Sequence, residues 1–130
     1  LSKKYALASF DLIMIDAPCS CLGTMRRAPD IRWRTTQKDV DAICATQAEI
    51  LPKAASFLKS GGVLIYATCS ILHEENEAQI EKFIAANPEF IHLNLSLEKL
   101  NDFKDNLGNF RLSPATSGTD GFFASVLKKK

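Results

Sequence analysis

The sequence has almost no excess of charge, with 16 Lys and Arg residues against 15 Asp and Glu and a formal net charge of +1. Such a chain is not a strongly basic nucleic-acid binder, so any nucleic-acid site must come from local clustering of basic residues. It also has no signal peptide and no run near ~18 apolar residues, which argues against export and against a membrane protein. The cytoplasm is the expected location, and it keeps thiols reduced.

Glycine is sparse where a cofactor-binding domain needs it. A complete nucleotide- or cofactor-binding α/β domain usually begins with a strand, a Gly-rich turn and a helix, and no such turn occurs here. Gly61-Gly62 precedes an expected strand instead of following one, so we interpret it as the end of a helix. The 130 residues are 46% apolar and 24% charged, a composition that predicts one globular domain with a real core.

The apolar patterns predict an α/β fold. Phe10–Asp16 and Val63–Thr68 are expected to be buried strands, because each is a short apolar run without clean alternation. Between them a helical pattern begins at the N-cap Thr36, and Pro52 is expected to kink or split it. The β–α–β order makes the two strands parallel. Farther along we expect a helix over 74–86, a partial strand over 90–95, an extended loop over 96–113 and a last, antiparallel strand over 122–127.

Two cysteines directly follow the two expected strands. Cys19 lies in Asp-Ala-Pro-Cys-Ser, and Cys69 in Ala-Thr-Cys-Ser. Parallel sheets bind ligands at the carboxyl ends of their strands, so both thiols and Asp16 are expected at one edge. A thiol there acts as a nucleophile if its pKa is lowered, and a carboxylate there accepts hydrogen bonds. The alternative is two buried cysteines near a loop.

A basic loop separates the first strand from the first helix. It holds one aromatic residue, Trp33, and one acid, Asp30. Basic side chains interleaved with an aromatic ring suit phosphate contacts and base stacking on RNA. The alternative is a solvated loop whose arginines pair with nearby acids while Trp33 is tucked into the core. The basic residues are Arg26, Arg27, Arg32, Arg34 and Lys38.

The remaining chemical residues give weaker signals. The acidic run Glu74, Glu75 and Glu77 is most simply the first turn of a helix. Asn76 is a candidate for holding the loop that carries Cys69. No metal site is predicted, because the spacing of Cys19 and Cys21 does not suit a zinc knuckle and no histidine forms a ligand pair. Cys44 fits a helix core, Cys21 remains unassigned, and Asp120 has the setting of a turn former.

Taken in order, these motifs resemble the Sun (RsmB-type) RNA cytosine-5 methyltransferases. The resemblance covers nearly the whole chain. Any one motif is weak, but the ordered set is highly specific. The motifs are Asp16-Ala17-Pro18-Cys19-Ser20, Gly23, Arg26-Arg27-Ala28-Pro29-Asp30-Ile31-Arg32-Trp33, Gln47 with Ile50-Leu51, Gly61-Gly62, Tyr66-Ala67-Thr68-Cys69-Ser70, Glu75-Asn76-Glu77 and Gly118-Thr119-Asp120-Gly121-Phe122-Phe123.

The resemblance implies a Rossmann-like fold, S-adenosylmethionine as methyl donor and a cytosine of ribosomal RNA as acceptor. By similarity, Cys69 is the nucleophile that adds to C6 of the base, and Cys19 promotes release of the methylated product. Asp16 is implied to lie where cofactor and base meet. Arg26, Arg27, Arg32 and Trp33 are the residues we expect to contact RNA.

The same resemblance implies that a cofactor loop precedes the strand at 10–16. Residues 1–130 are therefore expected to be the carboxyl-terminal portion of one catalytic domain, with an incomplete cofactor pocket and no turnover of its own. The strand at 10–16 would then be an exposed apolar edge that invites self-association. Two other functions remain open: a non-catalytic RNA-binding module, and a thiol redox or metal module with a Cys19–Cys21 disulfide or zinc.

Overall fold

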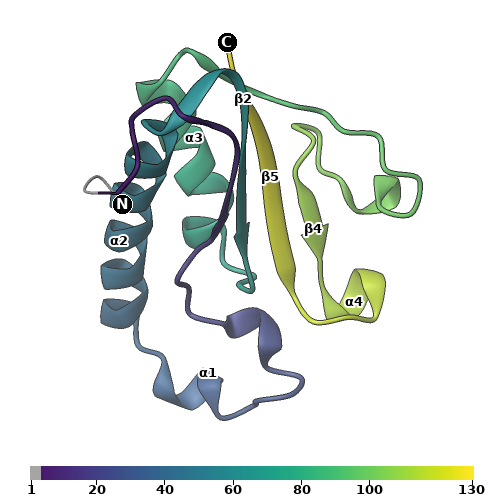
Figure 1. Cartoon of the computed structure of the whole chain (residues 1–130). Helices are drawn as coiled ribbons and strands as arrows, with labels where there is room; N and C mark the ends of the chain where they lie inside the picture. Colours follow the sequence, from purple (N-terminus) through teal and green to yellow (C-terminus); the bar gives the residue numbers. More distant parts are fainter. Residues whose placement is uncertain (1–3) are drawn as a thin grey trace.

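The computed structural model describes residues 4–130 and shows an α/β fold (Figure 1). One sheet carries the strands in the order β1-β2-β5-β3, with β4 also paired to β5. The helices α2 and α3 lie on the same side of this sheet in Figure 1. The strands are β1 (Phe10–Asp16), β2 (Leu58–Thr68), β3 (Phe90–His92), β4 (Phe110–Leu112) and β5 (Phe122–Lys129). The α-helices are α1 (Ile31–Arg34), α2 (Gln37–Ala55), α3 (Glu77–Ala86) and α4 (Pro114–Ser117), and the 3-10 turns are η1 (Leu22–Thr24), η2 (His73–Glu75) and η3 (Asn101–Phe103).

The first strands and the helix between them follow the predicted β–α–β order. β1 and β2 are parallel, and Asp16 at the end of β1 is paired with Ala67 of β2. Helix α2 begins where predicted: Thr36 is its N-cap, and its side chain and that of Asp39 form a capping box. The Thr36 hydrogen bonds also lower the pKa of the exposed Asp39 carboxyl. This cap fixes where the basic loop ends.

The core lies between the sheet and the two long helices. Leu51 of α2 and Ile80 of α3 are fully buried against Leu64 and Tyr66 of β2 and Phe123 of β5. Their spacing gives each helix one apolar face, and burying that face holds the helix on the sheet. The core therefore fixes the ends of β1 and β2 relative to each other.

The carboxyl-terminal strands add the antiparallel part of the sheet. β5 is antiparallel to β2 on one side, and β3 and β4 pair with its two halves on the other. The predicted last strand is confirmed and runs to Lys129. The partial strand expected over 90–95 is shorter, because only Phe90–His92 pairs with β5. The expected loop over 96–113 contains η3 and the three-residue β4, which is too short to leave a periodic signal.

Two expectations for the end of α2 need correction. The helix is not split at Pro52, because the proline lies in the last turn of one helix that ends at Ala55. Gly61-Gly62 does not end the helix but lies inside β2, in an irregular pairing between Phe10 and Leu12 of β1. Gly61 has a φ of 78° there, a left-handed conformation that favours glycine.

The first strand is less buried than predicted. Ile15 is buried and Ile13 half-buried on the helix side, whereas Leu12 and Met14 are 57% and 62% exposed. β1 forms one edge of the sheet, as expected. The apolar residues of β1 therefore lie on both faces of the strand, one packed against the helices and the other exposed. No helix of residues 4–130 is long and apolar enough to cross a membrane.

Candidate active site

The two cysteines that follow β1 and β2 lie in contact, as the strand arrangement predicts. The Sγ atoms of Cys19 and Cys69 are 3.4 Å apart, although 50 residues separate them in the sequence. The parallel pairing continues beyond the strands, since the backbone N–H of Ala17 donates to the carbonyl of Ala67 at 2.9 Å. This last rung sets the two thiol loops side by side at the carboxyl edge of the sheet.

A third thiol joins this pair. Cys21 Sγ lies 4.0 Å from Cys19 Sγ, and the three sulfur atoms of Cys19, Cys21 and Cys69 all lie within 4.8 Å of one another. Cys21 has a φ of 59°, in the left-handed region that a residue with a side chain rarely adopts. All three side chains are half-buried and none forms a disulfide. We call them the thiol cluster. The spacing of Cys19 and Cys21 in the sequence did not predict this cluster of three thiols.

A buried carboxylate joins the two thiol loops. Glu75 is fully buried and accepts hydrogen bonds from the backbone N–H and hydroxyl of Ser20, at 2.7 and 2.6 Å. The Ser70 hydroxyl donates to the same carboxylate. Glu75 therefore bridges the residue after Cys19 and the residue after Cys69. Glu74 and Glu75 lie in the first turn of the 3-10 helix η2, and Glu77 lies in the first turn of α3, so the prediction of first-turn acids is confirmed. The bridging role of Glu75 was not predicted.

Neighbouring polar groups hold this bridge in place. Asn76 donates from Nδ2 to the carbonyl of Ser70 at 2.9 Å and accepts at Oδ1 from Thr68 at 2.6 Å. The hydroxyl of Tyr66 donates to the carbonyl of Glu75 at 2.7 Å. Since Asn76 is itself fully buried, these contacts fix the loop that carries Cys69. The prediction that Asn76 holds this loop is confirmed.

Close backbone packing brings a third segment to the site. The N–H of Gly23 donates to the carbonyl of Cys69 at 2.9 Å, and the N–H of Gly121 donates to the carbonyl of Gly23 at 2.7 Å. A Cβ atom at Gly23 would meet the carbonyls of Cys69 and Gly121 far inside van der Waals contact. Glycine is required at 23 because no side chain fits between these backbones.

Burial controls the acidity of the thiols. It raises the pKa of the Cys69 thiol well above its ordinary value, and the hydrogen bonds with Cys19 and Cys21 raise it further. Burial also raises the pKa of Cys19, while hydrogen bonds from Cys21 and Cys69 work against that increase. Burial thus favours the protonated form of Cys69 and of Cys19, because a buried thiolate loses hydration.

The carboxylate of Asp16 lies at this same edge. It is exposed at the end of β1, and its side chain makes no ion pair or hydrogen bond within residues 4–130. This leaves its oxygens open to accept hydrogen bonds from a bound group.

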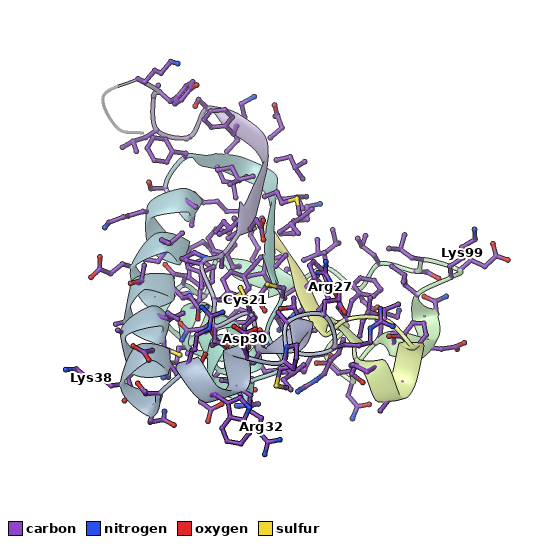
Figure 2. All side chains as sticks on the ribbon, turned by 90° about the horizontal axis from the view of Figure 1, so that it is seen from below. Cys21, Arg27, Asp30, Arg32, Lys38 and Lys99 are labelled. Carbon is purple, nitrogen blue, oxygen red and sulfur yellow. The ribbon has the colours of Figure 1, made fainter. Side chains whose placement is uncertain are left out.

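The basic loop leaves its aromatic ring in solvent. Trp33 is 82% exposed, and the guanidinium of Arg32 lies 5.5 Å from the centre of its ring. The alternative of a core Trp33 is therefore wrong. Figure 2 views the molecule from below and shows Arg32 at the bottom of the view, below Cys21 and Asp30, with Lys99 at the right-hand edge. An exposed indole beside a guanidinium offers a stacking surface close to positive charge.

Acids pair with part of this loop. Arg26 and Arg27 both form ion pairs with Asp120, and Arg34 pairs with Asp30 at 2.8 Å. Asp120 is thus more than a turn former, because it connects the basic loop to the turn before β5. The solvated-loop alternative is correct for these pairings, whereas Arg32 has no acidic partner within residues 4–130.

The sequence patterns missed several residues that shape the site. Ser20 and Ser70 gave no separate signal, although each follows a cysteine. Glu77 of α3 pairs with Arg111 of β4, and Arg111 also donates to the carbonyl of Ile71 at 3.0 Å. Only the fold brings Arg111 beside the loop after Cys69. A pair of residues 34 positions apart leaves no local pattern.

Comparison with known proteins agrees with the motifs. The family described as 16S rRNA methyltransferase RsmB/F matches residues 1–128. The chain belongs to this family. The resemblance inferred from the ordered motifs is thereby confirmed, and the α/β fold is the one this family uses.

Individual relatives match nearly all of the chain. Ribosomal RNA small subunit methyltransferase B of Pasteurella multocida (strain Pm70) is 41% identical over 122 residues, which are 92% of this chain and 26% of that protein. The crystal structure of PH0851 has a TM-score of 0.88 at 36% identity and covers 95% of this chain and 28% of that one. The crystal structure of NSun6 from Pyrococcus horikoshii with SFG has a TM-score of 0.74 at 30% identity, and the match covers 90% of this chain and 29% of that one. The chain thus spans about a quarter of each relative.

Proposed function

We propose that this chain carries the catalytic thiols of an S-adenosylmethionine-dependent RNA methyltransferase that modifies C5 of cytosine in ribosomal RNA. The observation that carries the proposal is the 3.4 Å contact between Cys19 and Cys69 at the carboxyl ends of β1 and β2. The family match and the relative named as a ribosomal RNA methyltransferase support the reaction class. SFG, an S-adenosylmethionine analogue, in the NSun6 structure supports the cofactor.

Cytosine chemistry explains why a thiol is needed. C5 of cytosine is a poor nucleophile, so Cys69 forms a bond from its Sγ to C6 and breaks the aromaticity of the ring. C5 then has enamine character and can attack the electrophilic methyl group that S-adenosylmethionine would supply, and the bond from sulfur to methyl breaks to leave S-adenosylhomocysteine. Loss of the C5 proton restores the double bond between C5 and C6, and the bond from C6 to Cys69 Sγ breaks. The base must leave its stack to reach Cys69.

Cys19 is proposed to assist the second half of this cycle. Its Sγ lies in contact with that of Cys69, so it is next to any base bonded there. A neighbouring thiol that exchanges a proton at this point promotes expulsion of Cys69 from the methylated base. The two thiols thus divide attack and release between them.

The described residues fit only part of S-adenosylmethionine. Asp16 is exposed at the end of β1, three residues before Cys19, and its carboxylate, which makes no ion pair or hydrogen bond within residues 4–130, suits the ammonium of the methionyl portion. The cofactor supplies an electrophilic methyl group. No Gly-rich turn follows a strand in the sequence, and the chain spans about a quarter of its relatives. We therefore propose that it is the carboxyl-terminal portion of a catalytic domain, with an incomplete cofactor pocket.

The isolated chain is expected to bind S-adenosylmethionine weakly or not at all and to have no turnover. Isothermal titration calorimetry measures this directly, and clear saturable binding would contradict it. We also propose that Arg26, Arg27, Arg32 and Trp33 contact RNA, because the three arginines and the indole ring are exposed and the Arg32 guanidinium lies beside that ring. A cytoplasmic setting agrees with four free cysteines.

The reaction is tested in the full-length protein that contains this chain. Cys69→Ala should abolish transfer of a labelled methyl group from S-adenosylmethionine to ribosomal RNA, while Cys44→Ala should retain it. Cys44 lies on α2 and its Sγ donates to the carbonyl of Glu74, apart from the thiol cluster. Full activity of Cys69→Ala would overturn the proposal and favour a non-catalytic RNA-binding module.

A further inference from the structure

The thiol cluster has the dimensions of a metal site. Zinc binds thiolates at about 2.3 Å with tetrahedral geometry, which places neighbouring sulfur atoms ~3.8 Å apart. Two of the sulfur separations bracket this value: 3.4 Å from Cys19 to Cys69 and 4.0 Å from Cys19 to Cys21. All three sulfur atoms lie within 4.8 Å of one another. Small side-chain rotations bring them to ligand distances from one central ion.

Cys21 has no part in the methyl transfer proposed above, yet the backbone directs it into the cluster. Its φ of 59° is unfavourable for a residue with a Cβ. The hydrogen bond from the hydroxyl of Thr24 to the carbonyl of Cys21, at 2.8 Å, helps hold this turn. Gly23, packed against Cys69, anchors the turn from the other side. The third sulfur is thus positioned by the fold rather than by a flexible loop end.

We propose that Cys19, Cys21 and Cys69 form a site for a thiophilic divalent cation such as Zn²⁺. Each thiol loses its proton to the buffer as a bond from sulfur to metal forms, so one cation exchanges for three protons. No sulfur changes oxidation state. Three protein ligands leave the fourth tetrahedral position to water, as in open zinc sites. Thiolate ligands select soft metals such as Zn²⁺ and Cd²⁺ over Mg²⁺ and Ca²⁺.

The ion would occupy both thiols proposed for catalysis. A metal-bound Cys69 cannot add to cytosine, so the site would reversibly inhibit methyl transfer and protect the thiols from oxidation. This consequence depends on the proposed function. The binding itself does not depend on it, because it follows from sulfur positions alone. A spectroscopic binding experiment therefore tests the site separately from the enzyme.

The full-length reduced protein is titrated with Co²⁺ under argon and then with Zn²⁺. We expect thiolate-to-cobalt charge-transfer absorption that saturates at one equivalent and disappears when Zn²⁺ displaces the cobalt. Cys21→Gly removes one ligand and relieves the left-handed strain, so this variant stays folded by circular dichroism. Cys21→Gly should weaken Co²⁺ binding more than about tenfold. Removing a residue that only hydrogen-bonds a metal ligand already costs about tenfold in affinity, and this variant removes a ligand itself. Cys44→Ser should bind as the unchanged protein does.

Alkylation provides the second readout. Zn²⁺ should slow iodoacetamide labelling of Cys19, Cys21 and Cys69 together, and Cys44 should label at an unchanged rate. Equal Co²⁺ affinity of Cys21→Gly and the unchanged protein would overturn the three-thiol site. So would saturation without charge-transfer absorption. Methyl transfer that is lost in Cys69→Ala but unaffected by Zn²⁺ would overturn the inhibition and leave the proposed function standing.

Discussion

Glu75 accepts two hydrogen bonds from Ser20, one from its backbone N–H at 2.7 Å and one from its hydroxyl at 2.6 Å, across 55 residues of sequence. The Ser70 hydroxyl donates to the same carboxylate. The residues immediately after both site cysteines therefore share one buried acceptor. This relationship makes the 3.4 Å contact between Cys19 and Cys69 a property of the folded chain, present before any substrate binds.

Glu75→Gln is expected to lower the free energy of unfolding by about 2 kcal/mol, because hydrogen bonds to a buried charged group are lost and an amide N–H₂ faces the Ser20 donors. Urea unfolding followed by circular dichroism measures the change. Glu74→Gln is the matched control, since Glu74 is the exposed neighbour of Glu75. Equal unfolding midpoints for the two variants would show that the carboxylate does not hold the two loops.

The buried thiols predict a particular dependence on pH. Burial raises the pKa of Cys69 and of Cys19 above the ordinary 9.0. The folded chain therefore keeps these protons at a pH where the unfolded chain loses them. The corresponding stability is fully present below the unfolded pKa and falls as pH rises toward the folded pKa. Unfolding midpoints should decrease above about pH 9.

Alkylation gives a direct check on the same groups. The rate of iodoacetamide labelling of Cys69, located by mass spectrometry, should begin to increase at a higher pH in the folded chain than in the urea-unfolded chain. The control is the unfolded chain at each pH, which reports the ordinary thiol. Coincident pH profiles for folded and unfolded chain would contradict the raised pKa of Cys69.

The sequence predicted the edge of the sheet that carries the site, and it did so through a few specific residues. Two apolar runs around a helical pattern with Thr36 as its N-cap were enough to place Cys19 and Cys69 together. The bridge through Glu75 was not predictable, because Ser20 lies 55 residues away and the local setting of Glu75 matches the start of a helix. Gly61 was misplaced because a glycine pair suits a helix end and a strand irregularity equally.

Trp33→Ala in the full-length protein should weaken RNA binding about tenfold or more, since stacking of one base on an aromatic ring contributes ~1–3 kcal/mol. Arg32→Ala should also reduce the slope of log affinity against log salt by about one. Fluorescence anisotropy at several salt concentrations measures both effects. Lys99→Ala removes the same charge far across the molecule (Figure 2) and should change little. If Lys99→Ala weakens binding as much as Arg32→Ala, RNA does not bind this loop specifically.

β1 has one edge without a partner strand within residues 4–130, which predicts self-association of the 130-residue chain, because an open strand edge with exposed Leu12 and Met14 is a template for another edge. Sedimentation velocity should show a concentration-dependent increase in mass, and Leu12→Lys should suppress it. Leu107→Lys introduces the same charge at a residue that is 48% exposed and outside the sheet. An unchanged oligomer in Leu12→Lys would exclude β1 as the interface.

The proposed division of labour between the thiols is tested most directly by trapping the base on the enzyme. In the full-length protein, Cys19→Ala should accumulate a covalent adduct with ribosomal RNA in the presence of S-adenosylmethionine, because Cys69 attacks but is not released. Gel electrophoresis under denaturing conditions detects the adduct, and peptide mass spectrometry should locate it on Cys69. Cys19→Ala/Cys69→Ala should form none. Absence of an adduct in Cys19→Ala, or its persistence in the double variant, would contradict the account.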